Sequence, residues 1–381
     1  GRRVDIQLKG AGQTAFSRRG DGKAALGPMI REYVISEAMY ALGIPTTRSL
    51  AVVATGEPVY RERPLPGAVL VRVASSHLRV GTVQWAAAHR DTTALEAIVA
   101  YTIQRHYPEA AEAPHPVRAL LDAIVEAQAR LVSQWQAVGF IHGVMNTDNM
   151  ALSGETLDYG PCAFMDAYDP ATVFSSIDRD GRYAYGQQPA IAQWNLARLA
   201  EALLPLLDED REVAVAVATD AIARFAQRFE HHWLEAFRGK LGLSTPEDGD
   251  AALISELLDA MLRHRADFTN TFVALALGTL PDIDAALWSD LTDWRGRLEA
   301  RWKRQDMPAH DIAALMRRHN PAFIPRNHLV EEAIAAAGEG NLVPATQLID
   351  VLSQPFDYDR VAPRYQAPSP EDQSYRTFCG T

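Results

Sequence analysis

The sequence predicts an α+β fold of two lobes, a small β-rich lobe followed by a large helical one. Two observations predict this fold. Strand-like runs and a single helical pattern share roughly the first 75 residues, whereas long helical patterns dominate from about Thr92 onward. Residues 1–80 are therefore expected to form the small lobe and residues 81–353 the helical lobe. Residues 354–381 carry several prolines and little periodicity, which predicts an irregular tail.

The small lobe is predicted from short patterns. Residues 3–9 alternate between apolar and polar side chains, which is typical of a half-buried strand. Its two faces carry Val4, Ile6 and Leu8 on one side and Asp5, Gln7 and Lys9 on the other. A helix is expected to begin at Pro28 and to end at Leu42, where Gly43 and Pro45 supply a stop. Two β-rich runs flanked by proline and glycine predict strands over residues 50–54 and 68–74.

The helical lobe is predicted from periodicity of about 3.6 residues. Helical stretches are expected over residues 117–138, 190–207, 212–241, 251–276, 331–337 and 344–352. Residues 161–188 are rich in Asp, Gly, Tyr and Ser, and we expect a long ordered loop there.

The amino-acid composition indicates which kinds of binding partner and which cellular compartment to expect. A hydrophobic content of 48% in 381 residues allows a large core. The net charge of −11 argues against nucleic acid or an anionic membrane as the main partner. No apolar run approaches the roughly 18 residues that a membrane span needs, so we expect a soluble protein. The two cysteines, Cys162 and Cys379, suggest a reducing compartment, and the Ala- and Arg-rich composition suits a bacterial cytoplasm.

The start of the chain predicts a missing segment. The sequence opens on Gly1 without an initiator Met and enters the first strand-like run almost at once. We therefore expect an N-terminally truncated small lobe.

One stretch carries most of the chemistry. His142-Gly143-Val144-Met145-Asn146-Thr147-Asp148-Asn149 is followed by Asp158-Tyr159-Gly160. Protein kinases use His-Arg-Asp-x-x-x-x-Asn and a later Asp-Phe-Gly, in which the first Asp accepts the substrate proton and Asn and the second Asp hold magnesium. The order of lobes and motifs therefore indicates a protein-kinase-like fold. The base position, however, falls on Val144, which cannot accept a proton.

Asn149 and Asp158 are the candidate metal ligands. Magnesium prefers carboxylate and amide oxygens together with substrate phosphates. Taken singly, these residues, with Asn146 and Asp148, are also ordinary turn formers. Their order and spacing after a predicted helix favour the metal interpretation.

Lys9 and Glu32 form the second candidate pair, since kinases hold a phosphate-binding lysine with a helix glutamate. Glu37 competes for this role, and periodicity alone favours a surface lysine beside a glutamate at a helix N-terminus.

Further candidates are weaker. Gly22 and its neighbour Asp21 provide a loop that can approach phosphate, and Arg72 and Arg79 can clamp it. The pair His231-His232 lacks the i, i+4 spacing of a helical metal site and is interpreted as solvated.

Longer motifs resemble the selenoprotein O family. The segments that carry the resemblance are residues 9–12, 17–18, 20–22, 30–32, 36–39, 42–48, 142–150, 157–161, 180–183 and 188–191. They run from the first residues towards the tail and share the order Lys-Gly-Ala-Gly, Gly-Asp-Gly, Asn-Thr-Asp-Asn-Met and Leu-Asp-Tyr-Gly-Pro.

The resemblance implies a pseudokinase that transfers AMP from ATP to Ser, Thr or Tyr hydroxyls of proteins, with ATP turned round relative to kinases and Mg²⁺ or Mn²⁺ as cofactor. UMP transfer from UTP is a variant within the family. Carried over, the catalytic residues are Asp148 as proton acceptor, Lys9 on phosphate and Glu32 as its partner. The nucleotide contacts are Lys9, Asp21, Gly22, Arg72, Arg79 and Asp158, and the metal ligands are Asn149 and Asp158.

Two departures from the family follow from this sequence. The family has a glycine-rich segment upstream of the phosphate lysine, and this chain begins after it. Bacterial relatives can also bridge a loop cysteine to one near the C-terminus. Cys379 fits the tail position, but the loop over residues 171–178 contains no cysteine, and Cys162 is the only other one.

Two other functions compete. An aminoglycoside-kinase type of phosphotransferase uses His-Gly-Asp with Asn five residues on, and Val144 replaces that Asp. An inactive nucleotide-binding scaffold accounts for Val144 but leaves Asn149, Asp158 and Lys9 unexplained.

Overall fold

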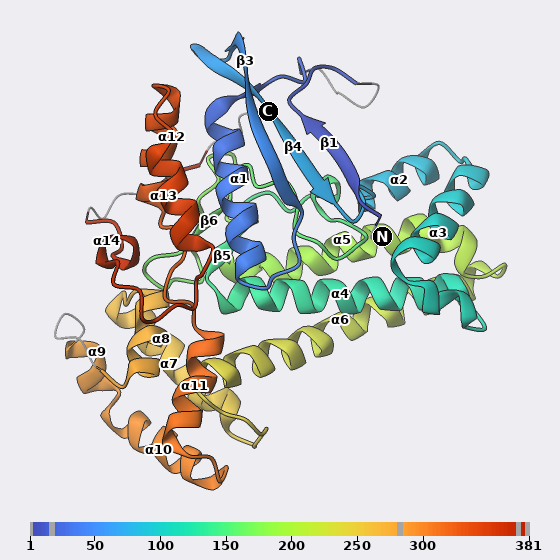
Figure 1. The fold of residues 1–381 in the computed structure, drawn as a ribbon. Coiled ribbons are helices and arrows are strands. Elements are labelled where there is room, and N and C mark those ends of the chain that lie inside the picture. The colour runs from blue at the N-terminus through green and yellow to red at the C-terminus, as the bar shows by residue number, and fades with distance from the viewer. Residues whose placement is uncertain (1–2, 15–19, 280–284, 371–374, 378–381) are drawn as a thin grey trace.

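A small antiparallel sheet and one long helix form the first lobe (Figure 1). The computed structural model describes residues 3–14, 20–279, 285–370 and 375–377. The elements of this lobe are β1 (Asp5–Lys9), β2 (Ala24–Ala25), α1 (Leu26–Ala41), β3 (Arg48–Tyr60) and β4 (Pro64–Ala74). The strands β1 and β2 pair with one edge of β4, and β3 pairs with its other edge. Met29 of α1 packs with Ala68 and Leu70 of β4, which fixes the helix on one face of the sheet.

The first strand lies where the alternation predicted it, but its apolar side is the exposed one. Ile6 is 62% exposed and Leu8 is exposed as well, while Asp5, Gln7 and Lys9 are half-buried. The inward face of this lobe is ionic, and the polar side chains of β1 find partners there. A period of two therefore predicted the half-buried strand correctly, and the structure shows that its polar face is the more buried one.

The second lobe is helical (Figure 1). Its helices are α2 (Val80–Ala88), α3 (Thr92–His106), α4 (Pro116–Ala137), α5 (Gln188–Leu207), α6 (Arg211–Lys240), α7 (Asp250–His264), α8 (Phe268–Leu277), α9 (Ala285–Asp290), α10 (Thr292–Arg304) and α11 (Ala309–His319). Short strands β5 (Phe140–Ile141) and β6 (Ala163–Phe164) pair antiparallel. The 3₁₀ turns are η1 (Pro108–Glu112), η2 (Thr147–Asn149) and η3 (Tyr185–Gln187). The helices α4, α5 and α6 pack on one another and lie below the sheet in the view of Figure 1.

The α+β two-lobed, kinase-like prediction is confirmed. Some boundaries were wrong. The stretch 251–276 is two helices, because Arg265 takes a left-handed conformation (φ 50°) and Asp267 caps α8 by accepting a hydrogen bond from the Asn270 backbone N–H (2.7 Å). The sequence patterns also missed α2, α10 and α11.

The chain returns to the first lobe near its end. The helices α12 (Asn327–Gly338) and α13 (Val343–Leu352) pack against α1 (Figure 1). One short helix, α14 (Pro363–Gln366), follows. The predicted domain boundaries at residues 80 and 353 stay predictions. Among the described residues, no helix is long and apolar enough to cross a membrane.

The two lobes are joined by hydrogen bonds behind the loops that carry residues 142–149 and Asp158. The Thr47 backbone N–H donates to the Thr156 carbonyl, and the Thr156 N–H donates to the Pro45 carbonyl, both at 2.9 Å. The Tyr159 hydroxyl bonds Thr46 Oγ1 from the same side. This connection places the Asp158 loop directly below β1 and α1.

Candidate functional site

Four charged side chains from four separate segments meet between the lobes. Lys9 of β1 donates to Glu32 of α1 (Nζ to Oε2, 2.8 Å) and also to Asp158 Oδ1. Arg72 of β4 donates to Glu32 (Nε to Oε1, 2.7 Å) and to Asp158 (Nη2 to Oδ1, 3.0 Å). Glu32 and Arg72 are almost fully buried. We call Lys9, Glu32, Arg72 and Asp158 the ion cluster.

The alternation of β1 explains how Lys9 reaches this cluster. Because Lys9 and Gln7 share the inward face, Gln7 Oε1 also accepts a hydrogen bond from Arg72 Nη1 (3.0 Å). Glu37, the competitor for Glu32, instead accepts from Arg48 (Nε to Oε1, 2.8 Å). The structure therefore pairs Lys9 with Glu32 and not with Glu37.

Burial and neighbouring charges shift the pKa values of Asp158 and Lys9 in opposite directions. Burial alone would raise the pKa of Asp158, but the cations Lys9, Arg72 and Arg79 together hold it well below its usual range. Burial lowers the pKa of Lys9, while Asp158 and Glu32 raise it by more, so the lysine is held charged. Arg79 adds a third cation near Glu32 and Asp158, and the Asp148 carboxylate acts on Arg79 from the neighbouring loop.

Asp158 is held in an uncommon backbone conformation. Its φ is 70°, in the left-handed region that aspartate tolerates better than most side chains. The Gly160 N–H donates to the Asp158 carbonyl (2.9 Å), and the next side chain, Tyr159, is fully buried. Such strain is concentrated at functional sites in proteins.

The loop over residues 142–149 is fixed by two buried hydrogen bonds of the His142 side chain. Its Nε2 donates to the Leu157 carbonyl (2.9 Å) and its Nδ1 accepts from the Val144 N–H (3.4 Å). Burial lowers the pKa of His142, which keeps the imidazole neutral for both bonds. Val144, at the kinase base position, is buried and apolar. His142 is therefore structural, and no proton acceptor occupies position 144.

Asn149 has one side-chain atom committed to the loop. Its Nδ2 donates to the Val144 carbonyl (2.9 Å), which assigns the amide and leaves Oδ1 as the oxygen that a metal ion can bind. Asp158 Oδ1 accepts from Lys9 and Arg72, whereas the one ion pair of Oδ2 within the described ranges is with the more distant Arg79 (3.9 Å). Two hard oxygen donors on neighbouring loops fit Mg²⁺ or Mn²⁺.

Asp148 lies against the start of α2. An ideal Cβ added to Gly81 would lie 2.2 Å from Asp148 Oδ1, so only glycine leaves room for the carboxylate there. The Val80 N–H donates to the Met150 carbonyl (3.0 Å) and ties α2 to the same loop. Sequence reasoning missed Gly81, and its position two residues after Arg79 was the only signal available.

Arg79 and His77 have buried nitrogens that lack partners. Arg79 Nε and His77 Nε2 have no hydrogen-bond partner within the described part of the chain. Burial, followed by the charges of Arg72 and Arg79, lowers the pKa of His77 to about 4. Sequence reasoning also missed His77. An unpartnered guanidinium nitrogen beside the cations Lys9 and Arg72 suits phosphate oxygens.

Asp21 and Gly22 are not in contact with the ion cluster. Asp21 binds Arg61 of the β3–β4 turn (Oδ2 to Nη1, 3.0 Å). Gly22 crosses Gly12 so closely that an added Cβ would lie 2.2 Å from the Gly12 carbonyl oxygen. The pair closes the loop between β1 and β2, whose residues 15–19 lie outside the described residues.

Comparison with known proteins decides the family. A family model described as protein adenylyltransferase SelO matches residues 1–353. The chain belongs to the SelO family. The protein nucleotidyltransferase YdiU of Syntrophotalea carbinolica is 56% identical over 383 residues, which cover 100% of this chain and 78% of the relative. YdiU of Geobacillus kaustophilus is 55% identical, with 100% and 79% covered, and YdiU of Halalkalibacterium halodurans is 55% identical, with 100% and 78% covered.

Membership of the SelO family confirms the resemblance and the enzyme class. The chain is a nucleotidyltransferase. The residue roles, the metal and the choice of nucleotide are matters of proposal.

Proposed function

We propose that this SelO-family enzyme transfers AMP from ATP to Ser, Thr or Tyr hydroxyls of proteins, with Mg²⁺ or Mn²⁺ as cofactor. The observation that carries the proposal is the ion cluster lying beside a catalytic loop whose kinase base position is Val144. Phosphate-binding cations are present, and the group required for ordinary γ-phosphoryl transfer is replaced by an apolar side chain.

The cations account for nucleotide binding. Lys9 and Arg79 supply charge to the phosphates, and the buried Arg79 Nε gains a partner when phosphate enters. Arg72 lies beneath them and holds Glu32 and Asp158 in place. Asp21 and Gly22 would contact the nucleotide from the β1–β2 side.

Asn149 Oδ1 and Asp158 Oδ2 would hold the metal ion, which when bound neutralises charge on the phosphates. While Oδ1 binds the ion, Asn149 Nδ2 would keep its hydrogen bond to the Val144 carbonyl. Lys9 and Arg72 share Asp158 Oδ1, so the ion would bind at the remaining oxygen, Oδ2.

Asp148 is the proposed proton acceptor. The acceptor hydroxyl oxygen forms a bond to the α-phosphorus, the bond from that phosphorus to the bridging oxygen breaks, and pyrophosphate leaves. The hydroxyl proton passes to the Asp148 carboxylate, which the packing against Gly81 holds in place.

The experiment is transfer of label from ATP carrying it at the α or the γ position, with a mixture of bacterial proteins as acceptors. We expect protein labelling from the α position alone, and none after EDTA treatment. Label arriving from the γ position contradicts the proposal and supports a phosphotransferase. Binding of ATP without any transfer supports the inactive scaffold. A parallel reaction with α-labelled UTP and Mn²⁺ decides between AMP and UMP.

The Asp148→Asn variant tests the base. Transfer is expected to fall roughly 10²–10⁴-fold with ATP binding retained, because only the proton acceptor is removed. An unchanged rate removes the assignment.

We place the reaction in the bacterial cytoplasm, where ATP and protein acceptors are available. The bacterial sources of the YdiU relatives support this location.

A further inference from the structure

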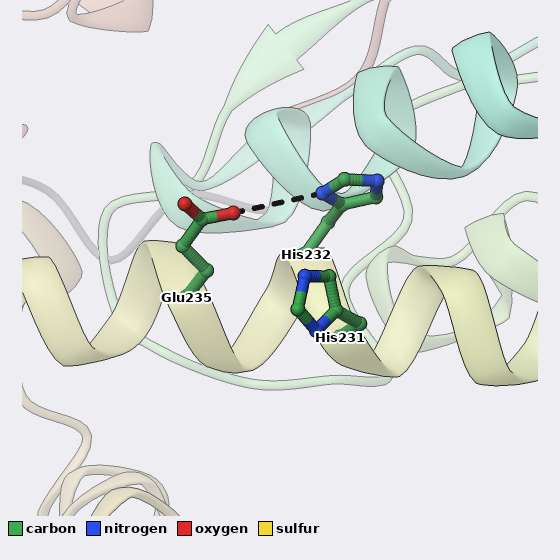
Figure 2. Close-up of side chains that lie close together, drawn as sticks. All are labelled: His231, His232 and Glu235. Atoms are coloured by element: carbon green, nitrogen blue, oxygen red, sulfur yellow. Dashed lines mark ion pairs between the residues drawn. The ribbon is translucent and has the colours of Figure 1, made fainter. Parts of the chain in front are cut away.

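Three side chains with metal-binding atoms gather on α6, a helix that contributes no residue to the ion cluster (Figure 2). They are His231, His232 and Glu235, and their ligand atoms all lie within 4.8 Å of one another. His231 and Glu235 are four residues apart and His232 and Glu235 three apart, so each histidine shares a helix face with the carboxylate. Glu235 supplies the i, i+4 partner that the histidine pair lacks in sequence.

A second carboxylate orients His232. Its Nε2 lies 2.6 Å from Glu126 Oε1 of α4, and Glu126 Oε2 lies 3.4 Å from Arg228 Nε. A neutral imidazole carries one proton, and a proton donated from Nε2 leaves Nδ1 with a free lone pair. Histidines that bind metals commonly donate their other N–H to a carboxylate in this way.

The free nitrogen of His232 faces Glu235. His232 Nδ1 lies 3.7 Å from Glu235 Oε2 (Figure 2), which is too far for a hydrogen bond. Tetrahedral bonds of about 2.1 Å place two ligand atoms roughly 3.4 Å apart. A small movement of the exposed Glu235 therefore brings the pair to metal-binding distance.

We propose that His231, His232 and Glu235 form a site for Zn²⁺ or a similar divalent transition-metal ion, with Glu126 as the orienting partner of His232. Two imidazoles and one carboxylate suit zinc, nickel or copper, whereas Mg²⁺ prefers oxygen ligands alone. His231 and Glu235 are exposed, so water completes the coordination.

The site differs in chemistry from the proposed catalytic metal site. Asn149 and Asp158 offer only oxygen and lie between the lobes, and none of the residues assigned to the reaction comes from α6. Because Glu126 belongs to α4, a bound ion fastens α6 to α4 through His232. We therefore expect thermal stability to rise with the logarithm of the free ion concentration once that concentration exceeds the Kd.

The test is a titration of the metal-free full chain with Zn²⁺ against a chromophoric chelator, in excess Mg²⁺ to fill the oxygen site. One equivalent is expected to bind, and Co²⁺ in its place is expected to give the visible absorption of a tetrahedral nitrogen–oxygen site. His232→Ala should abolish this binding, and His231→Ala and Glu235→Ala should weaken it. Glu126→Ala should weaken it about 10–100-fold, since outer-shell partners contribute this much.

His310→Ala is the matched control, because His310 is an exposed helical histidine beside Asp311. It should leave binding unchanged. The proposal is overturned if His232→Ala, shown to be folded by its melting temperature, binds Zn²⁺ as tightly as the unaltered chain. It is also overturned if His310→Ala weakens binding equally, or if less than one equivalent binds.

Discussion

The Asp148 carboxylate occupies the space that a side chain on Gly81 would need. Asp148 Oδ1 lies 2.2 Å from the position of an ideal Gly81 Cβ, and real Cβ contacts are almost never so short. The first turn of α2 thus sets the place of the proposed base, although α2 contributes no acid or base of its own.

Gly81→Ala should lower the rate of nucleotidyl transfer about 100-fold. The added methyl group forces Asp148 to move, and a displacement near 1 Å can cost this much. ATP affinity should change less than about twofold, because the ion cluster is untouched. The measurement is kcat and KM for labelled ATP, with Gly296→Ala as control, since a Cβ at Gly296 meets nothing within 4 Å. Equal loss in both variants would contradict the prediction.

Arg72→Met should destabilise the fold by about 3–5 kcal/mol. It removes one partner of a buried ion pair, since Glu32 and Arg72 side chains are each 1% exposed. Arg48→Met is the matched control, because Arg48 also pairs with a glutamate of α1 but is 39% exposed. That change should cost less than about 1 kcal/mol. Urea denaturation of both variants checks the difference, and similar losses would refute it.

The buried lysine at the end of α6 should make stability depend on pH. Burial lowers the pKa of Lys240 from its usual 10.5 to about 7, and its Nζ lies 4.0 Å from the centre of the Phe272 ring. Because the unfolded chain holds the proton between pH 7 and 10 and the folded chain releases it, the contribution of Lys240 to stability rises with pH over that range.

Lys240→Met should therefore stabilise the protein below pH 7. This gain should shrink by roughly 1.4 kcal/mol per pH unit above pH 7. Denaturation at several pH values measures the difference, and the exposed Lys303→Met is the control. A gain that does not vary with pH would show that Lys240 keeps its proton when folded.

The last described residues contact both α1 and the segment that follows Asp158. The Tyr375 hydroxyl donates to Glu331 Oε1 (2.6 Å) and accepts from Arg31 Nη1 (3.0 Å). The Thr377 hydroxyl donates to the Pro161 carbonyl (2.7 Å). Arg31 directly precedes Glu32, so the tail contacts the helix that supplies Glu32 to the ion cluster.

Tyr375→Phe should cost about 1 kcal/mol of stability, since it removes two hydrogen bonds of the hydroxyl while Arg31 and Glu331 keep their own ion pair. It should also reduce transfer activity, while Tyr60→Phe, at an exposed tyrosine, should do neither. Calorimetry and the α-label assay provide the two readouts. A stable Tyr375→Phe with full activity would show that the hydroxyl is dispensable.

The sequence predicted elements best where one pattern dominated. Residues 117–138 and 190–207 match α4 and α5 within a few positions because a single apolar stripe runs along each helix. The stretch 251–276 has the same periodicity on both sides of Arg265, so only its left-handed backbone reveals the break. The helix α10 is so polar that its pattern gave no signal.

The candidate site was predictable in its motifs and not in its contacts. Spacing predicts that Asn149 and Asp158 share a metal ion, and this stays a prediction. Glu37 competed with Glu32 in the sequence, and the structure pairs Glu37 with Arg48 instead. Which face of β1 lies inward depends on Arg72, 65 residues away from Gln7. Such long-range pairing is not encoded in local alternation.

The reversed face of β1 affects how the protein behaves in concentrated solution. Ile6 and Leu8 of β1, with Val4 just before it, form an exposed apolar strip. Among the described residues, β1 pairs only with β4. An exposed apolar edge strand is a template on which a second copy can add its own strand and begin to aggregate. Ile6→Lys interrupts this strip while leaving Lys9 and Gln7 on the opposite side, which makes it the first substitution to try for a protein that must stay dispersed.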